Sequence, residues 1–323
     1  MRLCGGWMMR FLRRIAYALA LVGMLICVPS GRAAGDPPAQ KLPSALLVFP
    51  LIQADETGGD TRIELLNLSG QGQDLQCFYV QGEDESCNEI GFFLSLTPYQ
   101  PISWLATEGL NDVLTHSAVP PFFSAGGELK CAVVPPSGQT DLEFYNTIQG
   151  RATVYSSSGR TVSYGAVAFQ RLSPGDFTGV MSLDGRTYAQ CPDKLHFDVI
   201  ADQPTAVPPS TSDLILVPCS EDLLLQIPAT ITVQFLIINE FEQQFSTSIS
   251  VTCFDREMLS QVSDSLLRPT LGTDTAHLVI RGTNGPLLGL VVDSVPFAGT
   301  TETGTAGNEP SFQGGRSATL VFP

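Results

Sequence analysis

The 323-residue sequence has only three histidines, His116, His196 and His277, and no cysteine pair in a C-x-x-C pattern. Structural zinc sites need closely spaced cysteine and histidine ligands, so zinc binding is disfavoured. The sequence also lacks the G-x-S-x-G motif of serine hydrolases and a glycine-rich phosphate loop between a strand and a helix. We expect each histidine to be a packing or surface residue. Enzymatic activity stays open, because paired carboxylates for glycoside hydrolysis come from distant strands and leave no local spacing.

Positive charge is scarce as well. Lys and Arg number 17 against 32 Asp and Glu, and residues 1–33 contain five of the basic residues and no acidic one. The remaining chain has 12 basic and 32 acidic residues, a net charge of −20. A field of this sign repels phosphate backbones and anionic lipid headgroups, so we expect neither nucleic acid nor a membrane surface as partner.

After the first thirty residues no apolar run reaches the ~18–20 residues of a membrane-spanning helix. Before that point, the basic residues Arg10, Arg13 and Arg14 precede an apolar stretch from Ile15 to Val28, which is followed by small residues. This order predicts a signal peptide over residues 1–33. An uncleaved membrane anchor is the alternative. We expect an exported protein of the periplasm, the cell surface or the extracellular space.

Six cysteines follow the predicted signal peptide. An even number in an exported protein is typical of disulfides, and it favours disulfides over a cysteine nucleophile. Pairing between neighbours within a domain predicts the bonds Cys77–Cys87, Cys131–Cys191 and Cys219–Cys253, although six cysteines permit many other pairings.

Short runs of alternating apolar residues, bounded by Gly, Pro, Asn and Ser, predict an all-β chain. Two hairpin turns are predicted, at residues 156–159 and at Asn284–Gly285. Clusters of proline predict a flexible lead over 34–44 and a linker over 202–212. These breaks divide the chain into a first domain at 45–201, with a long insertion at 82–125, and a second domain at 213–323.

Both predicted domains begin with an apolar strand that ends in proline, at 46–50 and 214–218. Each continues with a strand ending in asparagine, Asn67 or Asn239, and a strand containing cysteine, Cys77 or Cys253. The order favours an internal duplication and two tandem antiparallel β-sandwiches of immunoglobulin-like layout. Chance similarity between two β domains is the alternative. The likeness concerns architecture alone and assigns no function.

The insertion is the best candidate for a binding surface, because binding residues concentrate on loops held by a rigid scaffold. Its aromatic residues Tyr99, Trp104, Phe122 and Phe123 are a candidate platform for sugar rings or a protein partner. The alternative is that they close the core under a long loop.

Oxygen ligands for calcium are grouped in one loop, at Asp55, Glu56 and Asp60. The loop lacks the alternating pattern that fixes ligand directions, so a solvated loop is the alternative, and we expect no other cofactor.

The sequence therefore favours a non-enzymatic binding, adhesive or structural protein whose partner at the cell envelope is a protein or a glycan. A secreted carbohydrate-active module, either a glycan-binding domain or a carboxylate-based hydrolase, is the alternative. The last strand, residues 317–323, resembles residues 46–50 and is expected to complete the second domain. It is also a candidate edge for self-association.

Overall fold

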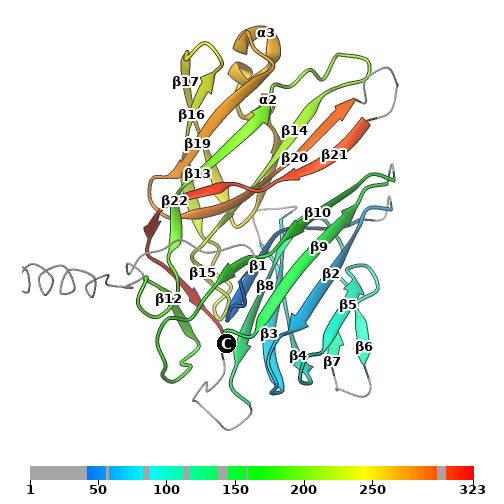
Figure 1. Ribbon diagram of the computed structural model, residues 1–323, viewed down its shortest axis with the longest axis vertical. Coiled ribbons are helices and arrows are strands. Elements are labelled where there is room, and N and C mark those ends of the chain that lie inside the picture. Colours follow the sequence, from blue (N-terminus) through cyan, green and yellow to red (C-terminus); the bar gives the residue numbers. More distant parts are fainter. Residues whose placement is uncertain are drawn as a thin grey trace, which may run out of the picture. The chain divides into compact units, whose positions relative to one another are not determined.

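The structure is a computed structural model, described for residues 42–55, 58–82, 87–112, 117–136, 145–157, 159–296 and 303–323. The predicted signal peptide and most of the predicted 34–44 lead lie outside these residues. Residues 35–323 form one compact unit. Its described part is all-β, as predicted, and is built from several sheets (Figure 1).

The first half of the chain forms two antiparallel sheets. Sheet I has the strand order β11 (Val167–Phe169), β1 (Leu46–Ala54), β8 (Ser124–Val134), β3 (Gln73–Gln81), β4 (Glu89–Leu96). Sheet II has the order β10 (Thr161–Gly165), β9 (Ile148–Tyr155), β2 (Asp60–Asn67), β5 (Pro101–Leu105). A small hairpin joins β6 (Leu110–Asp112) to β7 (Ser117–Val119). The inner faces of sheets I and II share one apolar core, because β1 contacts both β2 and β9.

The second half forms two further antiparallel sheets. Sheet III has the order β17 (Gln244–Thr252), β16 (Thr230–Asn239), β19 (Thr275–Gly282), β13 (Cys191–Ile200), β22 (Ser311–Arg316). Sheet IV has the order β18 (Asp255–Met258), β14 (Thr211–Pro218), β20 (Leu287–Pro296), β21 (Thr303–Asn308). Three short helices, α2 (Leu259–Val262), η1 (Asp264–Leu266) and α3 (Arg268–Leu271), contribute buried residues to a second core between these sheets.

Sheet IV belongs to both cores. Along β14, Leu214 and Leu216 are part of the second core, whereas Ile215 and Val217 are part of the first. Side chains alternate between the two faces of a strand, so the stretch 214–217 of β14 is apolar throughout because both of its faces are buried. The two halves are therefore joined by packing along this sheet, and not only by the connecting chain.

A small sheet V covers the outer face of sheet I. It consists of β12 (Val180–Leu183), β23 (Ala318–Val321) and β15 (Glu221–Asp222), with β23 in the middle. The β15–β23 pair is the single parallel pairing among the named strands that the structure describes. Phe322 packs edge-on against Phe78 of β3, with 5.7 Å between the ring centroids.

This position contradicts two expectations for residues 317–323. The strand does not complete the sheets of the second half, because it pairs with β12 and β15 instead. It also offers no free edge for self-association, since both of its edges are already paired. The resemblance to residues 46–50 indicated a buried apolar strand, but not its neighbours.

The six cysteines form three disulfides, as predicted. All three predicted pairings are wrong, namely Cys77–Cys87, Cys131–Cys191 and Cys219–Cys253. The observed bonds are Cys77–Cys131, Cys87–Cys253 and Cys191–Cys219. Locality fails because Cys77 and Cys131 lie directly opposite on the neighbouring strands β3 and β8, with a Cα–Cα distance of 4.1 Å. The other two bonds join segments that meet where the two halves of the chain pack together.

The strand before the predicted linker also joins the second half. β13 lies in the middle of sheet III, paired with β19 and β22. Within the linker, Asp202 is buried and accepts hydrogen bonds from the backbone N–H groups of Ser212 and Ser260, at 2.8 Å each. This segment is therefore fixed to its surroundings by its own polar groups. The immunoglobulin-like layout is not confirmed.

Candidate functional site

The outward face of sheet II carries an ordered set of polar side chains. Along β2, Thr61, Ile63 and Leu65 are buried, so the residues between them point outward. The strand register then aligns Glu64 with Ser103 of β5 on one side and with Arg151 of β9 on the other. A mixed row of hydroxyl, carboxylate and guanidinium groups therefore crosses the sheet.

Two arginines lie on either side of one carboxylate on this face. The Nε of Arg62 is 3.7 Å from Oε1 of Glu64, and the Nε of Arg151 is 3.4 Å from Oε2. All three side chains are well exposed, so these pairs add little to stability. Arg62 also donates a hydrogen bond to Ser103 Oγ at 3.3 Å. The guanidinium of Arg151 has five N–H donors, and its contacts in the described part of the chain involve one nitrogen, so it has donors available for a ligand.

A cleft of about 810 Å³ lies over this row. Its far wall comes from the second half of the chain, where Glu309 accepts a hydrogen bond from the backbone N–H of Gly165 at 2.8 Å. A second hollow, of about 550 Å³, shares Arg62 and Ser103 with it and continues along the sheet. The cleft has the size of ordinary small-ligand sites. Its remaining polar lining residues are Gln149 and Ser163.

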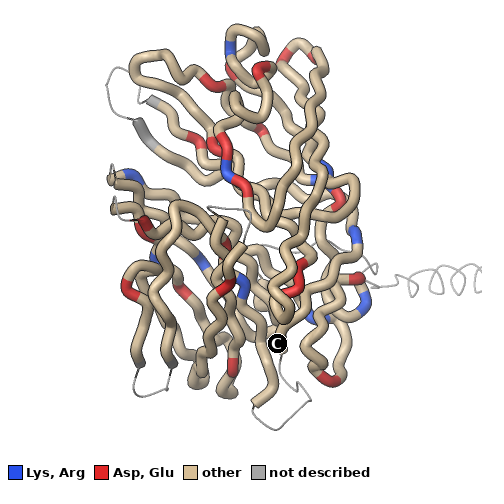
Figure 2. The backbone as a smooth tube through the Cα atoms, turned by 180° about the vertical axis from the view of Figure 1, so that it is seen from behind, with Lys and Arg blue, Asp and Glu red and all other residues tan. Residues whose placement is uncertain are grey.

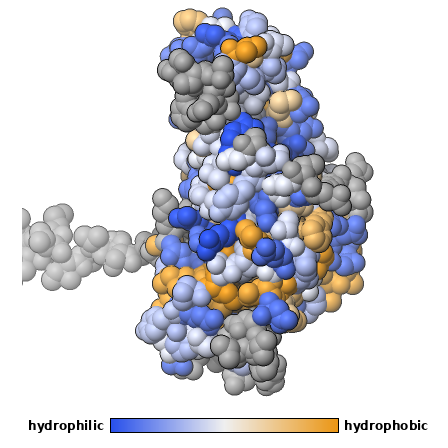
Figure 3. All heavy atoms as spheres, turned by 90° about the vertical axis from the view of Figure 1, so that its right-hand side faces the viewer, coloured by the Kyte–Doolittle hydropathy of each residue, from blue (hydrophilic) through white to orange (hydrophobic). Residues whose placement is uncertain are grey.

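The side of the molecule that carries β2 and β5 is shown in Figure 3, where hydrophobic residues form a band beside hydrophilic ones. Charged positions are scattered along the described strands of both halves (Figure 2). Charge alone therefore does not mark a site. The outward face of sheet II differs because its charged groups line a cleft.

The structure does not bring the four predicted platform aromatics together. Trp104 and Phe122 are buried, at 4% and 0% exposure, whereas Tyr99 and Phe123 are exposed at 67% and 57%. Trp104 donates a hydrogen bond to the hydroxyl of Tyr79 at 2.7 Å, and Phe122 stacks on the Tyr79 ring at 4.7 Å. Trp104 and Phe122 thus close the core, and a four-residue stacking platform is not formed.

Of the predicted calcium ligands, Glu56 lies outside the described residues. The carboxylate of Asp60 accepts hydrogen bonds from Thr61 and Thr107, and that of Asp55 accepts from Gln53 and Gly59. In the described residues no three His, Cys, Asp or Glu side chains are grouped as metal ligands. Calcium binding by this loop stays a prediction.

A hydrogen-bonded chain on sheet III was missed by sequence reasoning. Asp198 Oδ1 is 2.8 Å from Nδ1 of His277, whose Nε2 is 3.1 Å from Nδ1 of His196. The Nε2 of His196 is 3.0 Å from Gln313 Oε1. The sequence feature that could have indicated this chain is the spacing of His196 and Asp198, which lie two residues apart on one strand. No hydroxyl or thiol in the described residues hydrogen-bonds to either ring, so the chain has no nucleophile beside it. His116 lies outside those residues.

A further cleft, of about 920 Å³, lies between α3 and the turn at Glu240–Phe241. The guanidinium of Arg268, which lines this cleft, pairs with Asp274 and donates a hydrogen bond to Gln203 Oε1 at 3.1 Å. This cleft contains one arginine, whereas the cleft over sheet II contains two, on either side of one carboxylate.

No helix in the described part is long and apolar enough to cross a membrane. Three disulfides are typical of proteins that fold in an oxidising compartment, which is consistent with export.

Comparison with known proteins assigns no relative. No family model matches the sequence, and no curated protein matches it. A solved structure titled "Crystal Structure of Thermotoga maritima 1070" aligns with 39% of this chain and 97% of its own, at 9% identity and a TM-score of 0.29. A similarity this low carries no argument about fold or function.

Proposed function

We propose that this protein is an exported binding protein without enzymatic activity, and that the outward face of sheet II holds a neutral, hydroxyl-rich ligand such as an oligosaccharide. The observation that carries the proposal is the Arg62–Glu64–Arg151 group in its cleft. A pair of neighbouring sugar hydroxyls both donates and accepts hydrogen bonds. Planar guanidinium and carboxylate groups side by side match that pattern.

The neutral character of the ligand follows from long-range charge. The net charge of −20 on residues 34–323 repels anionic polymers, and the cleft itself contains Glu64 and Glu309 beside its two arginines. The carboxyl groups with raised pKa values, those of Glu89, Glu128, Asp202, Asp255 and Asp293, all lie outside this cleft. A binding role thus fits the cleft better than acid–base hydrolysis.

We further propose that the sheet pairs I–II and III–IV are two related β-sandwiches. Asn67 at the end of β2 and Asn239 at the end of β16 support this. Each is buried, and each uses its side-chain oxygen and nitrogen to close the turn that follows. The shared arrangement supports a duplication, and a sandwich scaffold would hold the binding face rigid.

Binding is tested by calorimetric titration of the disulfide-bonded protein with neutral gluco-, manno- and xylo-oligosaccharides, and with oligogalacturonate as the anionic comparison. We expect one neutral class to bind, with affinity reduced at least about 10-fold in Arg151→Ala and in Glu64→Gln. Arg186→Ala is the matched control, because Arg186 is exposed and lies outside the cleft. Binding of oligogalacturonate alone, or equal affinity in Arg151→Ala, would overturn the proposal.

A further inference from the structure

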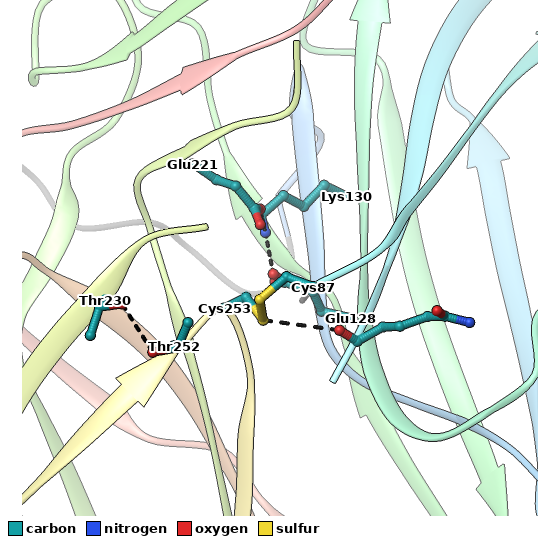
Figure 4. Close-up of a disulfide and its surroundings, with 8 residues drawn as sticks. Cys87, Glu128, Lys130, Glu221, Thr230, Thr252 and Cys253 are labelled. Carbon is teal, nitrogen blue, oxygen red and sulfur yellow. Dashed lines mark hydrogen bonds and ion pairs between the residues drawn. A yellow bond between two sulfur atoms is a disulfide. The ribbon is translucent and has the colours of Figure 1, made fainter. Parts of the chain in front are cut away.

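A buried ion cluster lies on the opposite side of the first half, between sheets I and V. Glu128 and Lys130 project from the same face of β8, and Glu221 reaches them from β15 (Figure 4). The Lys130 ammonium pairs with both carboxylates, and none of the three side chains is more than 2% exposed. Glu89 is the third carboxyl group at this cluster. It lies two residues after Cys87, which forms the disulfide with Cys253.

The cluster is unbalanced in charge. Three carboxyl groups, from Glu89, Glu128 and Glu221, accompany one ammonium, and each has a buried oxygen atom without a hydrogen-bond partner in the described residues. A buried charge without a partner is costly, and three ionised carboxylates would leave two such charges. The folded protein therefore needs a proton at this cluster.

Burial is the main cause of the proton's retention. It raises the pKa of Glu128 to about 8. The charge of Lys130 opposes this increase, and the charges of Glu221 and Glu89 reinforce it. Burial likewise raises the pKa of Glu89 to about 7, with contributions from Glu221 and from Asp222 of β15. Although burial lowers the pKa of Lys130, the carboxylates of Glu128 and Glu221 raise it above its usual value. Lys130 thus stays charged while the proton is held at Glu128 and Glu89.

The cluster holds a short strand that follows the Cys191–Cys219 disulfide and the hydrogen bond from Thr319 N–H to Ser220 Oγ. β15 has two residues, pairs with β23 on one side, and is followed by Leu223, whose N–H donates to Val321 O at 2.9 Å. Beyond it, Leu224, Leu225 and Ile227 are all more than half exposed. The ion pair with Lys130 is therefore the side-chain contact that links β15 itself to β8.

We propose that a proton held by Glu128 and Glu89, beside the Lys130–Glu221 ion pair, latches β15 onto β8, and that alkaline conditions which remove it release β15 with the loop up to Pro228. Release frees one edge of β23 and exposes the buried side chain of Leu223. An exported protein meets the pH of its surroundings directly, so this segment reports that pH. The latch is independent of the ligand proposed above.

The sign of the pH effect follows from the direction of the shifts. Between pH 4.5 and 8 the folded protein binds more protons at Glu128 and Glu89 than the unfolded chain does. Stability due to these groups is therefore complete below pH 4.5 and is lost as the pH rises toward 8.

The first test is the melting temperature between pH 6 and pH 9. We expect it to fall by about 5 °C in the wild-type protein, and by much less in Glu128→Gln, whose amide imitates the protonated acid. Glu108→Gln, at an exposed carboxylate, is the control and should follow the wild type. Equal pH dependence in Glu128→Gln and the wild type would rule out the latch.

The second test locates the opening by amide hydrogen exchange, corrected for the intrinsic effect of pH. We expect exchange of Glu221–Ile227 to accelerate at least about 10-fold from pH 6 to pH 9, while β16 stays protected. Glu128→Gln should remove the acceleration. Uniform acceleration in both segments would indicate general destabilisation and would overturn the proposal of a local latch.

Discussion

The Lys130 cluster and the Arg62 group contain the same kinds of charge in opposite surroundings. In both, two like charges lie on either side of one opposite charge, but Lys130 is 1% exposed and Arg151 is 61% exposed. In the core the imbalance must be neutralised by a proton, whereas at the surface water screens it and leaves donors for a ligand. Burial therefore decides whether such a group supports the fold or is available for binding.

The largest effect is expected for Lys130→Met, which tests whether burial makes the charge of Lys130 necessary for the fold. It leaves buried carboxylates without their cation, so we expect a loss of about 3–5 kcal/mol in the free energy of unfolding, measured by urea denaturation. The triple variant Lys130→Met, Glu128→Gln, Glu221→Gln removes every charge together and should be closer to the wild type. If the triple variant is the less stable of the two, unpaired charge is not the cause.

Next in size is the loss of the disulfide beside the cluster. Replacing Cys87 and Cys253 by serine opens a link between residues 166 positions apart. We expect a loss of about 2–4 kcal/mol, since cross-links over long loops restrict the unfolded chain. Mass mapping of the oxidised protein checks the connectivity independently, and a Cys77–Cys87 peptide would contradict the structure.

A smaller effect is expected at Trp104. Trp104→Phe keeps most of the apolar volume but removes the hydrogen bond to Tyr79, so we expect a loss of about 1–2 kcal/mol. Oligosaccharide affinity should be unchanged, because this indole is in the core. A selective loss of binding at wild-type stability would restore the sequence-based interpretation of Trp104 as a contact residue.

The smallest effect on stability is expected for Arg151→Ala. An exposed pair with Glu64 contributes little, so the free energy of unfolding should change by no more than about 0.5 kcal/mol. The same variant should show the affinity loss described above. A loss of stability comparable to that of Lys130→Met would remove the distinction between the two groups.

Local patterns predicted the all-β class because alternation of side chains is a property of each strand by itself. The hairpin at residues 156–159 is confirmed, since β9 and β10 pair directly across it. Asn284–Gly285 fails as a hairpin because it connects sheet III to sheet IV. Asn284 instead accepts a hydrogen bond from the N–H of Thr232 at 2.8 Å.

The sequence could not supply the neighbours of each strand. The apolar stretch of β14 predicted a buried strand, but not that its two faces belong to different cores. The disulfides failed for the same reason, because Cys131 meets Cys77 through a pairing between strands 54 residues apart. Arg62 and Arg151 lie 89 positions apart, and only the register of β2 with β9 places both beside Glu64.

The central position of β23 in sheet V also sets an order of events during synthesis. β23 is made after all other described strands, yet it covers sheet I, whose strands are made first. A partly synthesised chain therefore leaves this face of its earliest strands uncovered, with Phe78 and the Glu128–Lys130 pair on it, until residues 318–322 have been added. Sheet I is therefore fully covered only after the last described strand has been made.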